Sequence, residues 1–95
     1  MTTDETPDPA LAAAEDLARA EAIAVGGDTV GEHLGVHAEP GDPDVLVATH
    51  AFASTLPGYR GWYWAVTVAR LADTETVTVD EVVLLPGEGA LLAPA

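Results

Sequence analysis

Aromatic and arginine side chains gather in residues 56–70, LPGYRGWYWAVTVAR, which hold four of the five aromatic residues and two of the three arginines. Tyr, Trp and Arg carry most of the binding energy at protein interfaces, and a guanidinium also binds anionic ligands. We therefore predict a binding surface for a protein partner or a ligand that includes Tyr59, Arg60, Trp62 and Trp64. The alternative is that both tryptophans are core residues and that Arg60 pairs with a carboxylate such as Glu32.

Glu32 and His33 lie between Gly31 and Gly35, in a segment that predicts a tight loop or a single helical turn. We expect both residues to extend the binding surface. A carboxylate beside an imidazole is also a candidate acid and base pair. An enzyme built on this pair would use Arg60 to hold an anionic substrate, and it requires a cleft that joins the three residues.

The remaining histidines and hydroxyl groups do not predict a metal site or a nucleophile. His33 and His37 are four residues apart, but Gly35 interrupts a helix there, and in a strand the two side chains would be about 13 Å apart. Ser54 follows His50 by four residues without a Gly-x-Ser-x-Gly motif. The glycine pairs lack the lysine of a phosphate-binding loop. We predict no catalytic residue, no cofactor and no bound metal.

The charge balance restricts the partners of the chain. Sixteen acidic residues and three basic ones give a formal net charge of −13 at pH 7. Phosphate contacts need clustered Lys and Arg, so nucleic acid and membrane surfaces are excluded as expected partners. An acidic surface can instead imitate nucleic acid, which is a further alternative. Cysteine is absent, and no apolar run is long enough to cross a bilayer. We expect a cytoplasmic protein.

Hydrophobic periodicity predicts the elements that position these residues. Residues 1–8 are polar and predict a flexible arm, with Thr6 or Asp8 as a helix cap, and residues 9–95 predict one domain. A helix is predicted over residues 10–25, and strands over 36–39, 45–54, 62–71 and 76–85, with a bulge or an exposed edge at Asp80 and Glu81. Leu91 and Leu92 are candidates for docking a C-terminal tail. Short turns make neighbouring strands antiparallel. The predicted fold is α+β, with one N-terminal helix packed on a meander sheet of three or four strands.

Several short motifs occur in the order GEHLG, LPGYRGW, WAVTVAR and EVVLLPG, followed by ALLAP. In these motifs the chain resembles the N-terminal part of a family of actinobacterial proteins of unknown function. The resemblance covers roughly the last two-thirds of the chain. It implies an actinobacterial cytoplasmic protein, and it implies no activity.

These observations favour a non-catalytic module that binds a protein partner or a second copy of itself. The aromatic and arginine clustering supports this prediction, and so does the shortage of catalytic groups. The alternatives are a small enzyme or anionic-ligand-binding domain that uses Glu32, His33 and Arg60, and an acidic mimic of nucleic acid.

Overall fold

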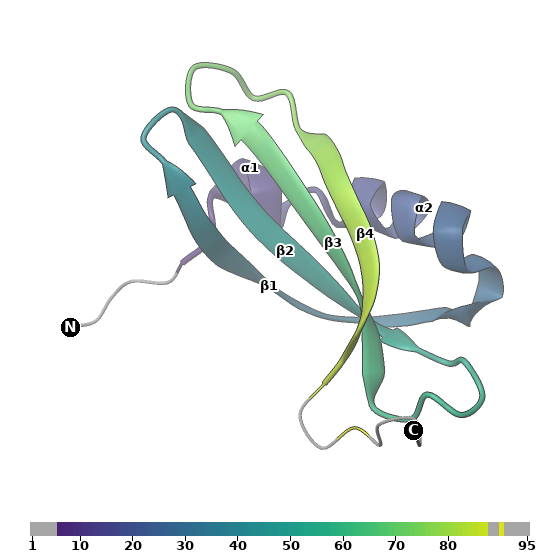
Figure 1. Ribbon diagram of the computed structural model, residues 1–95. Helices are drawn as coiled ribbons and strands as arrows, with labels where there is room; N and C mark the ends of the chain where they lie inside the picture. Colours follow the sequence, from purple (N-terminus) through teal and green to yellow (C-terminus); the bar gives the residue numbers. More distant parts are fainter. Residues whose placement is uncertain (1–5, 88–89, 91–95) are drawn as a thin grey trace.

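The protein folds into a layer of helices on an antiparallel sheet, and the computed structural model describes residues 6–87 and residue 90 (Figure 1). Two short helices come first, α1 (Pro9–Ala12) and α2 (Glu15–Gly26), and a 3-10 turn, η1 (Gly27–Thr29), leads into the sheet. The strands are β1 (Val30–Asp42), β2 (Val45–Ser54), β3 (Trp62–Leu71) and β4 (Thr78–Pro86). The predicted α+β class is confirmed.

The four strands form one sheet in the order β1-β2-β3-β4, with every neighbouring pair antiparallel. This is the predicted meander, and it follows from connections too short for a crossover. Both helices lie on the same side of the sheet (Figure 1). Among the described residues, no element covers the opposite side, which we call the open face.

The helical segment predicted over residues 10–25 is divided into α1 and α2 by Ala13 and Ala14. Ala14 leaves the helical region, with ψ at 28°. Asp8 caps α1, because its Oδ2 accepts hydrogen bonds from the backbone N–H groups of Ala10 and Leu11 at 3.1 and 3.2 Å. Asp8 was one of the two predicted caps. The chain therefore changes direction at Ala13 and Ala14, and α1 and α2 are two separate helices.

Asp8 is also joined to the sheet by a bidentate ion pair. Arg70, near the end of β3, donates from Nε to Asp8 Oδ2 at 2.8 Å and from Nη2 to Oδ1 at 2.7 Å. The hydrogen bonds from the Arg70 guanidinium hold the pKa of the Asp8 carboxyl below its ordinary value. Of the predicted arm, residues 1–5 lie outside the described part of the chain, and Asp8 is bound to the folded domain.

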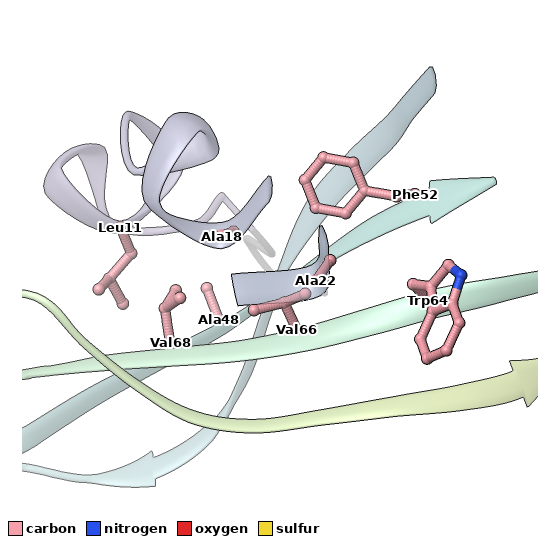
Figure 2. Packing of buried hydrophobic residues seen from close by; sticks show 8 residues of the cluster. All are labelled: Leu11, Ala18, Ala22, Ala48, Phe52, Trp64, Val66 and Val68. Carbon is pink, nitrogen blue, oxygen red and sulfur yellow. The ribbon is translucent and has the colours of Figure 1, made fainter. Parts of the chain in front are cut away.

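Small side chains let the helices approach the sheet closely. Ala18 and Ala22 of α2 are fully buried against the sheet (Figure 2). The buried cluster consists of Leu11, Ala18, Ala22, Ala48, Phe52, Trp64, Val66 and Val68. Ala48 and Phe52 come from the β2 face that was predicted to contain Leu46, Ala48, His50 and Phe52. Burying such side chains is the main favourable term in folding.

The sheet begins earlier than the sequence predicted. Residues 28–35 were expected to form a loop or a helical turn before a short strand at 36–39, but β1 runs from Val30 to Asp42. The register of β1 against β2 shifts on both sides of His33. Gly35 has a φ of +147°, a backbone conformation that other residues rarely adopt. The predicted loop or helical turn is therefore wrong, because the two glycines are accommodated as irregularities within one long strand.

The last strand agrees with its prediction. Thr67 pairs with Glu81 and Val68 pairs with Val79, so Asp80 is the extra residue of a bulge. The predicted docking of Leu91 and Leu92 falls outside the described residues.

The contact between Gly26 and Trp64 provides a test of the close helix–sheet packing. A Cβ on Gly26 would lie 2.6 Å from Trp64 Cζ2. Gly26→Ala should therefore lower the free energy of unfolding by about 1–3 kcal/mol through overpacking, although alanine is ordinarily the better helix residue. Urea unfolding followed by tryptophan fluorescence measures the change.

Ala24→Gly, at an exposed position of α2, is the control. It should lose only the helix propensity of alanine, about 1 kcal/mol, and should leave the fluorescence of the folded state unchanged. A Gly26→Ala protein as stable as the parent would contradict the close packing.

Candidate functional site

The aromatic cluster predicted as a binding surface is divided between two faces of the sheet. Trp64 is a core residue with 7% of its surface exposed, and its Nε1 has no hydrogen-bond partner among the described residues. Tyr63 lies on the open face, since successive strand residues alternate. Trp62 is half-buried, and its ring meets Tyr59 edge to face at 5.0 Å. Trp64 is therefore part of the core on the helix side of the sheet and not of an exposed binding surface.

The turn between β2 and β3 exposes the polar part of the cluster. Tyr59 is 37% exposed, and Arg60 is exposed beside it. No ion pair between Arg60 and Glu32 is present in the described part of the chain. The other two arginines are engaged on the helix side: Arg70 binds Asp8, and Arg19 donates to the Gly31 carbonyl at 2.9 Å.

Glu32 and His33 point to different surroundings on β1. Glu32 is exposed, whereas His33 is half-buried beneath the helices. His33 pairs across the strands with Phe52, and their rings meet edge to face at 5.1 Å. Glu32, His33 and Arg60 line none of three hollows of the described surface: the one on the open face, one beside Asp8 and Ala38, and one beside Asp44 and Leu71. The cleft that the enzyme alternative requires is not among them.

A chain of hydrogen bonds runs from β1 to α1 through two histidines. His50 of β2 is fully buried, and its Nε2 lies 2.8 Å from the Leu11 carbonyl oxygen. A carbonyl only accepts, so we assign the His50 proton to Nε2. Nδ1 of His50 then accepts from Nε2 of His33 at 2.9 Å. The remaining nitrogen of His33, Nδ1, lies 3.6 Å from a Glu15 carboxylate oxygen.

This arrangement holds His50 in its neutral form. Burial lowers the pKa of His50, and the nearby His33 lowers it as well, whereas the Leu11 carbonyl and Glu15 act in the opposite direction. Glu15 from α2 is a charged group beside the pair, and the Arg19 guanidinium lies nearby, 4.8 Å from the centre of the Phe52 ring that His33 contacts. The hydrogen bonds from His33 to His50 and from His50 to the Leu11 carbonyl therefore link the sheet to the first helix.

The open face contains a wide hollow of about 480 Å³. Strand register divides it into two halves. Tyr63 pairs with Leu85, and Ala65 pairs with Val83, forming an apolar half. Thr49 pairs with His37 and with Thr67, and Thr67 pairs with Glu81, forming a polar half. The hollow is lined by His37, Glu39, Pro40, Val47, Thr49, Tyr63, Ala65, Thr67, Glu81, Val83 and Leu85.

Hydrogen bonds orient the Glu39 carboxylate in the polar half. Its Oε2 accepts from the Thr49 hydroxyl at 2.7 Å and from His37 Nε2 at 2.8 Å. The second oxygen, Oε1, takes part in neither bond. The Glu39 side chain is 33% exposed, whereas His37 is 58% exposed. Glu39 is therefore a carboxylate with a fixed orientation at the rim of the hollow.

Neither a cluster of metal-ligating side chains nor a membrane-spanning helix is present in the described part of the chain. No group of three His, Asp or Glu side chains converges there to hold an ion. His33 and His37 face opposite sides of the sheet, so they do not act together. No helix within residues 6–87 is long and apolar enough to cross a membrane.

The family described as "Protein of unknown function (DUF3027)" matches residues 31–95 of the chain. The chain belongs to this family. The match begins at Gly31 and includes the sequence of all four strands apart from Val30. The resemblance to an actinobacterial family, inferred from the motifs, is confirmed.

Mycobacterial relatives extend this result to most of the chain. It is 48% identical over 85 residues to "Uncharacterized protein Rv0877" of Mycobacterium tuberculosis and equally to "Uncharacterized protein Mb0901" of Mycobacterium bovis. The alignments cover 88% of the chain and 31% of each relative, so the chain spans about a third of the length of these relatives. No solved structure matches it.

The sequence did not reveal the features that the sheet assembles. The histidine pair joins residues 17 positions apart, and it depends on the register shifts of β1. The hollow needs the pairing of all four strands. Strand alternation placed Tyr63, Ala65 and Thr67 on a shared face opposite the tryptophans, and this was the signal that could have located it.

The histidine pair predicts a pH dependence of stability. Because the pKa of His50 is lowered in the fold, the unfolded chain takes up the proton first. The contribution of neutral His50 to the free energy of unfolding is complete above pH 6.5, the ordinary pKa of histidine. This contribution is lost as the pH falls towards the lower pKa of the folded state. His50→Gln, which keeps an N–H donor for Leu11, should reduce the slope of unfolding free energy against pH by up to about 1.4 kcal/mol per pH unit.

Urea unfolding between about pH 5.5 and pH 8, a range around the ordinary histidine pKa, measures this slope. Ala24→Gly, at an exposed position of α2, removes no titratable group and should retain the parent slope. If His50→Gln and the parent protein lose stability equally, the assignment of the buried neutral histidine is wrong.

Proposed function

We propose that the chain is a non-catalytic protein-interaction module and that its docking surface is the open face, with Tyr59 and Arg60 at the end from which β3 begins. The observation that carries this proposal is the hollow with Tyr63, Val83 and Leu85 on a side of the sheet that no described element covers. Apolar surface of this kind, rimmed by polar groups, is typical of interaction sites.

The edges of the sheet are poor alternatives to its face. The outer strand β4 has a bulge at Asp80 and ends at Pro86. The other outer strand, β1, has register shifts around Gly35 and contains Pro40. Bulges, prolines and acidic side chains are the usual means of preventing strand addition. A partner strand is therefore better accommodated across the face.

Electrostatics favours a different protein over a second copy. Each chain has a net charge of −13, so two copies repel one another. The hollow is lined by Glu39 and Glu81 and by no arginine. We infer a protein partner in the same compartment, which the proposal takes to be the cytoplasm.

The enzyme alternative lacks an observation in its favour. It needs Glu32, His33 and Arg60 around one substrate, whereas His33 is bonded to His50 beneath the helices. The nucleic-acid mimic needs rows of carboxylates at regular spacing, and the open face instead joins two carboxylates to an apolar half. The interaction module is the function that fits both halves of the hollow.

Selection of peptides from a random library against the whole chain tests the docking surface. Binding should be weakened about tenfold or more by Tyr63→Ser and by Leu85→Ser, since central apolar contacts dominate interfaces. Titration calorimetry of the selected peptides measures the change, and circular dichroism confirms that each variant is folded.

Ile23→Ser and Val25→Ser are matched controls, because these side chains are 45% and 61% exposed on the outer side of α2. They should leave the affinity within about twofold of the parent, as contacts outside an interface contribute little. Peptides whose binding depends on Ile23 or Val25, and not on Tyr63 or Leu85, would locate the interaction surface on the helices and refute the proposal.

A further inference from the structure

We infer that the segment of the partner protein that binds the open face is basic as well as apolar. It places an apolar side chain over Tyr63, Val83 and Leu85. It also places a Lys or Arg side chain between Glu39 and Glu81. This inference rests on the proposed function and specifies the chemistry of the partner. Three observations lead to it.

The first observation is the distribution of charge around the hollow. Glu39 comes from β1 and Glu81 from β4, so the carboxylates flank the polar half from the two outer strands. The chain has no lysine, and its three arginines lie elsewhere. Arg19 and Arg70 are hydrogen-bonded on the helix side, and Arg60 is in the turn beyond the hollow. In the described part of the chain no arginine contacts the two carboxylates, and the basic group beside Glu39 is the imidazole of His37.

The second observation is the orientation of Glu39. Thr49 and His37 both bind its Oε2, which fixes the carboxylate before a partner arrives. Oε1 is not used in these two bonds. A carboxylate held in this way has less conformational freedom to lose, and an ammonium or guanidinium is its strongest hydrogen-bond donor. Glu39 is therefore suited to a cationic side chain.

The third observation is the division of the hollow into rows. The row of Ala65 and Val83 is apolar, and the row of Thr67 and Glu81 is polar. Neighbouring rows on one face are two residues apart along a strand, about 6.6 Å. A segment with an apolar residue followed at short distance by a basic one therefore fits both halves together. An entirely apolar segment would leave two carboxylates desolvated without a partner.

Four synthetic heptapeptides with blocked ends provide the test. LVLSKSK combines both features, LVLSESE reverses the charge, LVLSSSS removes it, and SSSSKSK removes the apolar residues. Each is titrated into the isotope-labelled whole chain, and amide shifts are followed by NMR. LVLSKSK should bind most tightly and shift the amides of Val47, Ala65, Thr67 and Val83.

Charge-matched variants separate local contacts from the overall acidity. The double variant Glu39→Gln with Glu81→Gln should weaken LVLSKSK by about fivefold, the effect of two partly exposed ion pairs. The double variant Glu21→Gln with Glu75→Gln changes the charge equally at exposed positions away from the hollow. It should alter the affinity by less than about twofold, because distant surface charges are screened by salt.

Each other outcome overturns a defined part of the inference. If LVLSESE or LVLSSSS binds the same amides as tightly as LVLSKSK, the docking surface stands and the basic partner is wrong. If the control variant weakens LVLSKSK as much as the Glu39 and Glu81 variant, general charge attraction explains the binding and the basic site is wrong. If no LVL peptide shifts the open-face amides, or if a second copy occupies the face, the proposed docking surface itself is wrong.

Discussion

The close approach of the helices to one face of the sheet is the constraint on which the rest of the structure depends. Ala18 and Ala22 have side chains short enough to bring α2 onto the sheet, where Ala48, Val66 and Val68 are fully buried. Both helices therefore lie on the same side of the sheet. A chain of this length forms a single core, and no described segment covers the opposite side, where Tyr63 and Leu85 lie. The open face is thus a consequence of how the core is built.

Two polar links hold the helical layer in position. His50 donates to the Leu11 carbonyl, and Arg70 binds Asp8, so the first helix is attached to β2 and β3. Alanine packing alone would let the helices slide along the sheet. The hydrogen bond of His50 and the ion pair of Arg70 are directional, so these two links fix the position of the helices on the sheet. His50 would otherwise be an expensive residue to bury, because an unpaired polar group in a core is destabilising. Its hydrogen bonds to His33 and Leu11 explain why the fold tolerates it.

Much of the architecture was predictable because local signals agreed with the final structure. The strands predicted over residues 45–54 and 62–71 have the bounds of β2 and β3, and a bulge lies at Asp80, where a bulge or an exposed edge was predicted. The length of β1 was not predictable, because Gly31 and Gly35 usually interrupt regular structure and here form the irregularities of a long strand. The candidate site was only partly accessible to sequence reasoning. Tyr, Trp and Arg clustering drew attention to β3, which contributes Tyr63, Ala65 and Thr67 to the hollow, yet Trp64 faces the core. The hollow also depends on residues from the other three strands, whose register the sequence did not specify.

Solvent exposure of the methyl groups on the two sides of the sheet tests this account most directly. A soluble gadolinium chelate broadens the NMR signals of methyl groups that it can approach. The account predicts strong broadening for Val47, Val83 and Leu85 on the open face and little for Leu11, Val66 and Val68 beneath the helices. Equal protection of both sets would show that the open face is already covered in the isolated chain, and the surface proposed here for a partner would not exist.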